Sequence, residues 1–255
     1  MTSVILYRPS ASGLQQANPI TKLVLAGTLL AAAATIQPLA QLLAVFIVAL
    51  VPLAAWSRVL ALFLRTCARL IWPFALSLGV IQGFFAPGST ILLSLGPLAL
   101  KAEGLGAAAV FSSRILLGLG SATLLMLTTR PDMLMLALVQ RGLPRQLSYI
   151  VVTALQIIPS FQSRAQGILD AQRSRGLETE GGVGRRMRAL VPLIGPLVLG
   201  SLMALEERAI ALESRAFMRP GPRTSLCAIP DSRPQAVVRW ILVATMIALV
   251  LHRVL

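Results

Sequence analysis

Residues 23–55 read LVLAGTLLAAAATIQPLAQLLAVFIVALVPLAA, 33 consecutive positions without a charged side chain. As a single helix this stretch would be about 50 Å long at ~1.5 Å per residue, whereas the hydrocarbon core of a bilayer is only ~30 Å thick. Pro38, in the middle of the stretch, would also interrupt a helix. The stretch therefore predicts a hairpin of two short membrane spans.

The composition of the chain supports the same class. Of its 255 residues, 56% are hydrophobic and 13% are charged, and the mean hydropathy is +0.80, which is too apolar for an ordinary soluble domain. We expect the protein to be retained whole, because its first 20 residues lack the basic, apolar and small-residue order of a cleavable leader.

The net charge of +14 favours basic loops held on the cytoplasmic side of a membrane over nucleic-acid binding. The two cysteines, Cys67 and Cys227, are far apart, and the chain has a single histidine. These residues therefore predict neither a metal cluster nor a disulfide framework.

Three further spans are expected. They cover about Leu70–Phe85, Gly104–Leu127 and Pro234–Leu251. Before the first of them we expect a basic loop with three arginines, Arg58, Arg65 and Arg69. The apolar but short Thr90–Leu100 is expected as an external loop or a re-entrant piece. Arg114, inside the second of these spans, either packs at an interface or contacts a partner.

The residues between the last two spans are chemically different from the rest. From Arg130 to Arg239 the chain carries 15 of its 23 basic and 8 of its 9 acidic residues. Two apolar segments lie here, Leu147–Phe161 and Ala189–Leu205, but crossing the bilayer would export the arginines between them. We therefore expect both segments to be long amphipathic helices on the cytoplasmic side.

The predicted fold is an all-α integral membrane protein with about five transmembrane helices and a cytoplasmic helical domain. Its predicted portions are residues 1–128 with about four spans, residues 129–233 as the cytoplasmic domain, and residues 234–255 as the last span.

Enzyme chemistry finds little support in the sequence. The glycine-rich residues 181–184 are followed by arginines rather than by the Lys-Ser/Thr of a phosphate-binding loop. No Asp or Glu lies inside a confident span, so the carboxylate relay of a proton-coupled pump is missing. A self-contained secondary transporter, a membrane enzyme and a membrane scaffold remain as alternatives.

A short pattern occurs twice, 40 residues apart. Ala171–Leu177 and Ala211–Phe217 share Ala, Ser and Arg at equivalent positions, and each ends a helical stretch, before Gly176 and before Pro220-Gly221-Pro222. An arginine in the last turn complements the helix dipole, and its planar head can bind carboxylates or carbonyls of a partner. Merely solvated helix ends would give the same pattern.

Five motifs in order carry a resemblance to a known family. They are Asn18-Pro19-x-x-Lys22, Thr129-x-Pro131-x-x-Leu134, Gly142-Leu143-Pro144, Ile158-Pro159, and the two triplets Ser174-Arg175-Gly176 and Ser214-Arg215-Ala216. In these motifs the chain resembles the transmembrane coupling (T) subunits of energy-coupling factor transporters, which are vitamin and metal-ion importers of the ABC class.

Two departures from the family pattern concern the triplets and one position upstream. Both triplets begin with Ser where the family has Ala, and Ala216 stands where the family usually has Gly. Gln156 stands where relatives often have Arg. The departures put in question whether the two triplets bind their partners with equal strength.

The resemblance implies a non-catalytic subunit of the plasma or inner membrane. Its triplets would dock into two ABC-type ATP-binding subunits, identical or different, with Arg173, Glu213 and Pro159 as supporting residues. The helices would carry a small membrane-embedded substrate-binding (S) subunit. ATP and Mg would be bound by the partner ATPases, and this chain would hold no cofactor. The substrate would be a vitamin or a transition-metal ion such as cobalt or nickel.

Overall fold

The computed structural model describes residues 13–87, 89–95, 98–176, 182–219, 221, 229 and 231–254. Several residues used above lie outside this part of the chain, namely residues 1–12, Leu177, Gly181, Pro220, Pro222 and Cys227. The chain divides into two compact units. The first comprises Met1–Leu143 with Ile229–Leu255, and the second comprises Pro144–Ala228.

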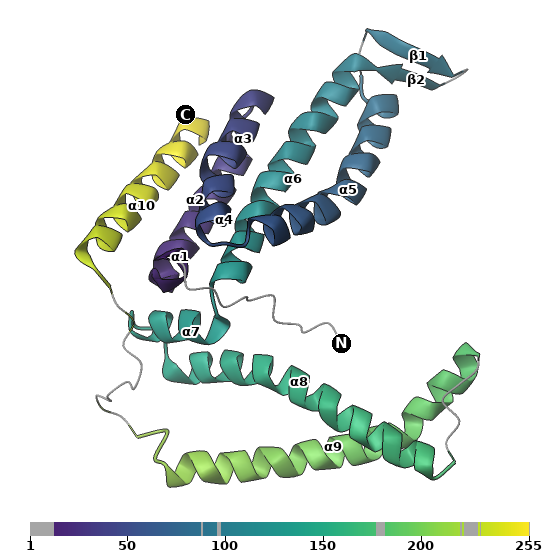
Figure 1. Ribbon diagram of the computed structural model, residues 1–255, viewed down its shortest axis with the longest axis vertical. Coiled ribbons are helices and arrows are strands. Elements are labelled where there is room, and N and C mark those ends of the chain that lie inside the picture. The colour runs from purple at the N-terminus through teal and green to yellow at the C-terminus, as the bar shows by residue number, and fades with distance from the viewer. Residues whose placement is uncertain are drawn as a thin grey trace. The chain divides into compact units, whose positions relative to one another are not determined.

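The first unit is a bundle of apolar helices (Figure 1). Its elements are α1 (Gly13–Gln16), α2 (Pro19–Thr35), α3 (Leu39–Val45), the π-helical turn η1 (Phe46–Leu50), α4 (Val51–Trp56), α5 (Leu60–Phe85), β1 (Ile91–Leu95), β2 (Leu98–Lys101), α6 (Ala102–Thr128), α7 (Pro131–Val139) and α10 (Arg233–Val254). Four stretches are long and apolar enough to cross a membrane: Leu39–Trp56, Leu60–Phe85, Ala102–Thr128 and Arg233–Arg253. With the shorter apolar helix α2, they confirm the predicted all-α membrane fold of about five spans.

The start of α5 differs from the expected basic loop. Arg65 and Arg69 lie within the helix, which begins at Leu60, and only Arg58 sits in the turn, with a positive φ of 57°. Residues 60–64 are apolar and favour helix, so the helix begins about ten residues before the uncharged run that starts at Leu70. The two arginines can reach water with their long side chains.

The connection between α5 and α6 contains a β-hairpin instead of a re-entrant piece. Strands β1 and β2 pair antiparallel, with Leu95 opposite Leu98. Glu103 closes the base of the hairpin, because its carboxylate accepts the backbone N–H groups of Ser89 and Thr90 at 3.2 and 3.1 Å. The aliphatic run is compatible with strand as well as helix, and its length of four to five residues per strand favours strand.

The core of the first unit lies where the helical turns from α3 to α4 meet α5 and α6. The largest fully buried side chains include Phe63, Leu50 and Leu117. Gly120 permits this approach, since a Cβ there would lie 3.0 Å from the side chain of Leu50. The end of α5 and the start of α6 also approach closely, because a Cβ at Gly104 would overlap the backbone of Gln82.

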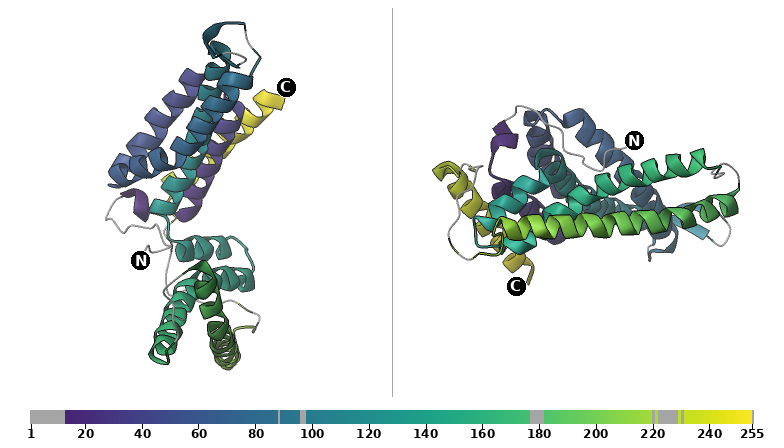
Figure 2. Two further views of the ribbon diagram at one scale, coloured as in Figure 1. Left: turned by 90° about the vertical axis from the view of Figure 1, so that its right-hand side faces the viewer. Right: turned by 90° about the horizontal axis from the view of Figure 1, so that it is seen from below.

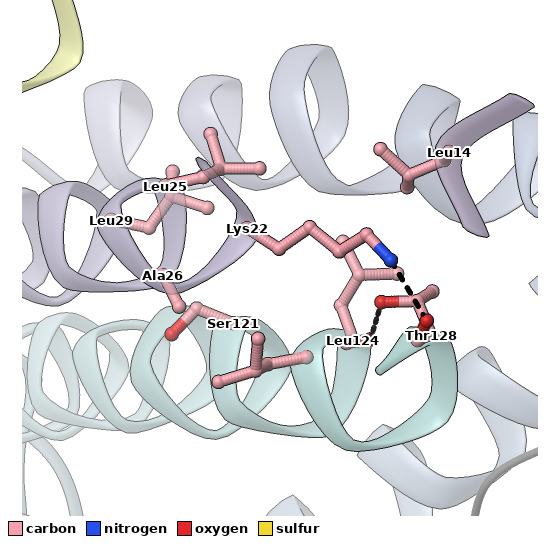
Figure 3. A pocket seen from close by; sticks show the side chains of 9 residues that line it. Leu14, Lys22, Leu25, Ala26, Leu29, Ser121, Leu124 and Thr128 are labelled. Atoms are coloured by element: carbon pink, nitrogen blue, oxygen red, sulfur yellow. Dashed lines mark hydrogen bonds between the residues drawn. The ribbon is translucent and has the colours of Figure 1, made fainter. Parts of the chain in front are cut away.

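Helices α2 and α6 are antiparallel, and each caps the other with a basic side chain. Lys22 of α2 is buried and donates to the carbonyl oxygen of Thr128, the last residue of α6, at 3.0 Å (Figure 3). At the other end, Arg114 of α6 donates to the carbonyl oxygen of Ile36 at 3.2 Å and to Gln37 at 2.8 Å, just after α2 ends. The last carbonyls of a helix have no partner inside it, so these bonds satisfy groups that lipid could not. These two bonds within the chain favour the packing interpretation of Arg114.

The Asn-Pro-x-x-Lys motif explains the start of α2. The side chain of Asn18 caps the helix by accepting the N–H of Ile20 at 3.0 Å, and Pro19 occupies the first helical position, where no N–H is needed. The N–H of Asn18 donates to the side chain of Gln235 on α10 at 3.1 Å. Lys22 also donates to the carbonyl oxygen of Gln15 at 3.1 Å. The motif therefore joins α1, α2, α6 and α10.

A carboxylate links the ends of α7 and α10. Asp231 accepts hydrogen bonds from Arg239 at 3.2 Å and from Arg141 at 2.9 Å. The bond from Arg239, helped by the positive charges of both arginines, holds the pKa of the Asp231 carboxyl below its ordinary value. Since α7 also packs against α2, the first unit includes the chain up to Leu143.

Replacing Lys22 by methionine should destabilise the first unit by about 1–3 kcal/mol, because two carbonyl oxygens in apolar surroundings would lose their donor. Thermal unfolding in detergent measures the change. The matched control is Arg253→Met, which removes a similar 2.7 Å bond to the carbonyl of Ala34 at an exposed position. We expect a shift within about 0.5 kcal/mol there, and equal shifts in both variants would contradict the capping role.

Replacing Gly104 by alanine should destabilise the α5–α6 pair by about 1–3 kcal/mol. A Cβ at Gly104 would overlap the backbone carbonyl of Gln82, whereas at Gly106 on the same helix it meets nothing within 4 Å. In the same unfolding assay Gly106→Ala should be neutral or slightly stabilising. An unchanged midpoint for Gly104→Ala would show that the helices do not approach so closely.

Candidate functional site

The second unit consists of two long helices, α8 (Arg145–Ser174) and α9 (Val183–Ser214). Figure 1 and the right-hand view of Figure 2 show them running the length of this unit in opposite directions. Each apolar segment of the sequence continues without a break into the polar helix end that follows it. Pro159 lies inside α8, and Pro192 and Pro196 lie inside α9. A proline removes one backbone hydrogen bond but does not end these helices.

The two helices cross at small residues. Arg164 of α8 donates to the carbonyl oxygen of Gly200 on α9 at 3.2 Å. A shallow groove beside this bond is lined by Gly167 and Ala171 of α8 and by Pro196 of α9. No described side chain of α8 is fully buried. The unit therefore has little core, and a few specific contacts hold its helices together.

The two predicted triplets adopt the same backbone conformation. Arg175 follows the last residue of α8 with φ −91° and ψ 9°, and Arg215 follows the last residue of α9 with φ −87° and ψ 9°. The next residue is left-handed in both, Gly176 at φ 89° and Ala216 at φ 51°. Weak sequence similarity thus corresponds to two equivalent helix ends.

The side chains of the triplets divide into inward and outward groups. Ser174 and Ser214 each donate their hydroxyl to a backbone oxygen of their own helix at 3.1 Å. Arg175 and Arg215 are exposed, and within the described part of the chain neither guanidinium has a hydrogen-bond or ion-pair partner. Each tip therefore presents five unused donors in a planar arrangement.

The three supporting residues have different positions. Arg173 forms an ion pair with Asp170 at 3.5 Å, and the backbone oxygen of Glu213 accepts the N–H of Ala216 at 2.8 Å. Pro159 lies 16 residues before Arg175 on the same helix, about 24 Å away at ~1.5 Å per residue. The structure therefore brings Arg173 and Glu213 to the tips but not Pro159.

Both helices also carry an exposed apolar stripe. On α8 it consists of Leu147, Ile150, Val151, Leu155, Ile158 and Phe161, and on α9 of Val191, Ile194, Val198, Leu199, Leu202 and Leu205. The spacing of three and four residues places each set on one face of its helix. Apolar patches of this extent usually mark contact with a protein or with lipid.

The described residues contain no group of three or more His, Cys, Asp or Glu that could hold a metal ion.

Comparison with known proteins places the chain in a family. The model of the CbiQ family, described as cobalt transport protein, matches residues 10–226. The chain belongs to this family. The resemblance found in the sequence motifs, to the T components of energy-coupling factor transporters, is confirmed by this match and by the curated relatives.

Three relatives illustrate the similarity, all described as energy-coupling factor transporter transmembrane protein EcfT. The protein of Listeria innocua is 32% identical over 171 residues, 64% of each chain. That of Thermanaerovibrio acidaminovorans is 34% identical over 180 residues, 67% of this chain and 66% of the relative. That of Lacticaseibacillus paracasei is 28% identical over 227 residues, 86% of each chain. The matched stretch spans slightly less than two thirds of the first relative.

Sequence reasoning missed several residues of this CbiQ-family chain that support the tips. Asp170 and Arg164 belong to the polar half of α8, where a charge pattern alone predicts only a solvated face. Tyr149 lies 68 positions before its contact Phe217, and no local pattern signals such a pair.

Exchanging the left-handed residues of the two tips should have opposite effects. Gly176→Ala should destabilise the end of α8 by about 1 kcal/mol, since an alanine is strained at φ 89°. Ala216→Gly should be neutral or stabilise the end of α9 by up to about 1 kcal/mol, because strain relief exceeds the entropy cost of glycine. Amide hydrogen exchange at each helix end measures both.

The matched control is Gly167→Ala, inside α8, where an added Cβ meets nothing within 4 Å. There alanine should slow exchange, because it favours helix over glycine. If Gly176→Ala also slowed exchange, the left-handed conformation at that tip would be refuted.

Proposed function

We propose that this CbiQ-family chain is the T component of an energy-coupling factor importer. It passes ATP-driven motion from two ABC-type ATP-binding subunits to a membrane-embedded substrate-binding (S) subunit. The observation that carries the proposal is the pair of exposed arginines, Arg175 and Arg215, on helix ends of the same backbone conformation. Two equivalent tips on one unit fit two similar partners.

The chemistry of the tips suits docking rather than catalysis. A guanidinium binds carboxylates or backbone carbonyls in fixed geometry and stays charged at every physiological pH. It complements the negative end of its own helix, so the helix holds it at the tip. Arg175 and Arg215 would therefore transmit force through interfaces, while ATP and Mg would be bound by the partner ATPases.

The apolar stripes of α8 and α9 support the second contact of the proposal. Their large side chains are exposed in this chain, and burial against a small membrane protein or the bilayer interface would remove them from water. The arginine-rich loops and helix ends favour a cytoplasmic position for this unit. The family description of cobalt transport makes a transition-metal ion a candidate substrate beside a vitamin.

Removing both tip arginines should uncouple the chain from its ATPases. We expect the double variant Arg175→Ala, Arg215→Ala to insert in the membrane normally and to lose the ATPases, since each buried arginine contributes about 2–5 kcal/mol to an interface. The measurement is affinity purification from the native membrane in mild detergent, followed by mass spectrometry and an ATPase assay of the eluate.

The matched control is Arg208→Ala, which removes an exposed arginine from α9 before the tip and should leave recovery of the ATPases unchanged. Unchanged recovery of ATPases with the double variant would reject the proposed coupling site. Recovery of the unaltered chain alone, without any ATPase, would favour a self-contained secondary transporter or a scaffold.

A further inference from the structure

The chain that follows the second tip folds back onto the beginning of α8. After Arg215, the ring of Phe217 contacts the ring of Tyr149, with centroids 5.1 Å apart and planes tilted by 53°. Both side chains are half-buried, in a unit where no described side chain of α8 is fully buried. The aromatic pair therefore attaches the residues that follow α9 to the first turns of α8.

Two neighbouring contacts strengthen this attachment. Arg145, the first residue of α8, donates to the carbonyl oxygen of Gly221 at 3.2 Å, and the side chains of Gln146 and Met218 approach to 3.9 Å. The backbone after Arg215 is fixed as well, because the N–H of Phe217 donates to the carbonyl of Leu212 in α9 at 3.0 Å.

This attachment and the crossing of the helices are two separate joints between α8 and the segment formed by α9 and the residues after it. The helices are joined at Arg164–Gly200 and again at Tyr149–Phe217. Between the joints lie about 22 Å of α8, and about 21 Å of α9 from Gly200 to its last residue, Ser214, at ~1.5 Å per residue. Two helices joined at one point can pivot about it, whereas a second joint away from the first opposes that pivoting.

We propose that Tyr149 and Phe217, with Arg145, form a brace that makes the Arg215 tip and the start of α8 move together. The brace deepens the proposed function and rests on it. A load on Arg215 from its ATPase would reach the start of α8 through Phe217 and Tyr149, and α8 begins at Arg145, two residues after Leu143. Tyr149 and Phe217 are positioning residues, since they act through Arg215 and touch neither ATP nor substrate.

The first test separates binding of the ATPases from transmission. In the complete transporter in liposomes, Tyr149→Ala should leave the ATPases bound and hydrolysing ATP, because Arg215 is intact. Uptake per ATP hydrolysed should fall about two- to tenfold, the loss expected for one aromatic pair. Tyr149→Phe keeps the ring and should retain the uptake ratio of the unaltered protein.

The effects of Tyr149→Ala and Phe217→Ala should not add, because both remove the same contact. An additive loss, or an uptake ratio that Tyr149→Ala leaves unchanged, would overturn the brace.

The second test restores the attachment by other means. Cysteines replace Gln146 and Met218 in a background with Cys67→Ala and Cys227→Ala, and a short bifunctional maleimide joins them. In the Tyr149→Ala variant the link should restore the uptake per ATP hydrolysed. With Tyr149 present the link should leave this ratio unchanged, because the proposed brace keeps these two segments in contact throughout transport. Loss of uptake on linking, or no rescue, would overturn the proposal. Failure of the proposed function would appear separately, as absence of bound ATPases from the unaltered protein.

Discussion

The bond between Lys22 and the carbonyl oxygen of Thr128, with its counterpart between Arg114 and Ile36, is the constraint on which the first unit depends. Each basic residue stands 14 positions from the helix end that the other caps, about 21 Å along the axis. Helix ends in apolar surroundings need such donors. The two bonds therefore fix the register of α2 against α6, and α10 follows because Asn18 binds Gln235.

The two units differ in how much buried core holds their helices together. The first has fully buried side chains such as Phe63 and Leu117, whereas α8 in the second has none within the described residues. A helix pair with little core resists bending through its backbone hydrogen bonds but reorients at low cost in free energy. Such a pair suits transmission of motion, provided that discrete contacts such as Arg164–Gly200 and Tyr149–Phe217 define how it moves.

Much of the architecture could be predicted from the sequence because it depends on local patterns. Uncharged runs gave the spans, and the break at Pro38 gave the hairpin between α2 and α3. The end of α8 before Gly176 was predicted from the glycine, whereas the second helix was expected to stop before Pro220 and α9 ends earlier, at Ser214. The β-hairpin was missed because a short aliphatic run is compatible with strand, helix or loop.

By itself, the sequence determined the membrane class, the approximate spans and the two arginine-tipped helix ends, since hydropathy and capping act over a few residues. Only the tertiary structure decided what Lys22 and Arg114 bind, because their acceptors lie 106 and 78 residues away. It likewise revealed that Ala216 adopts the left-handed conformation of Gly176, and that Phe217 meets Tyr149. Contacts between distant segments depend on helix packing, which no local pattern encodes.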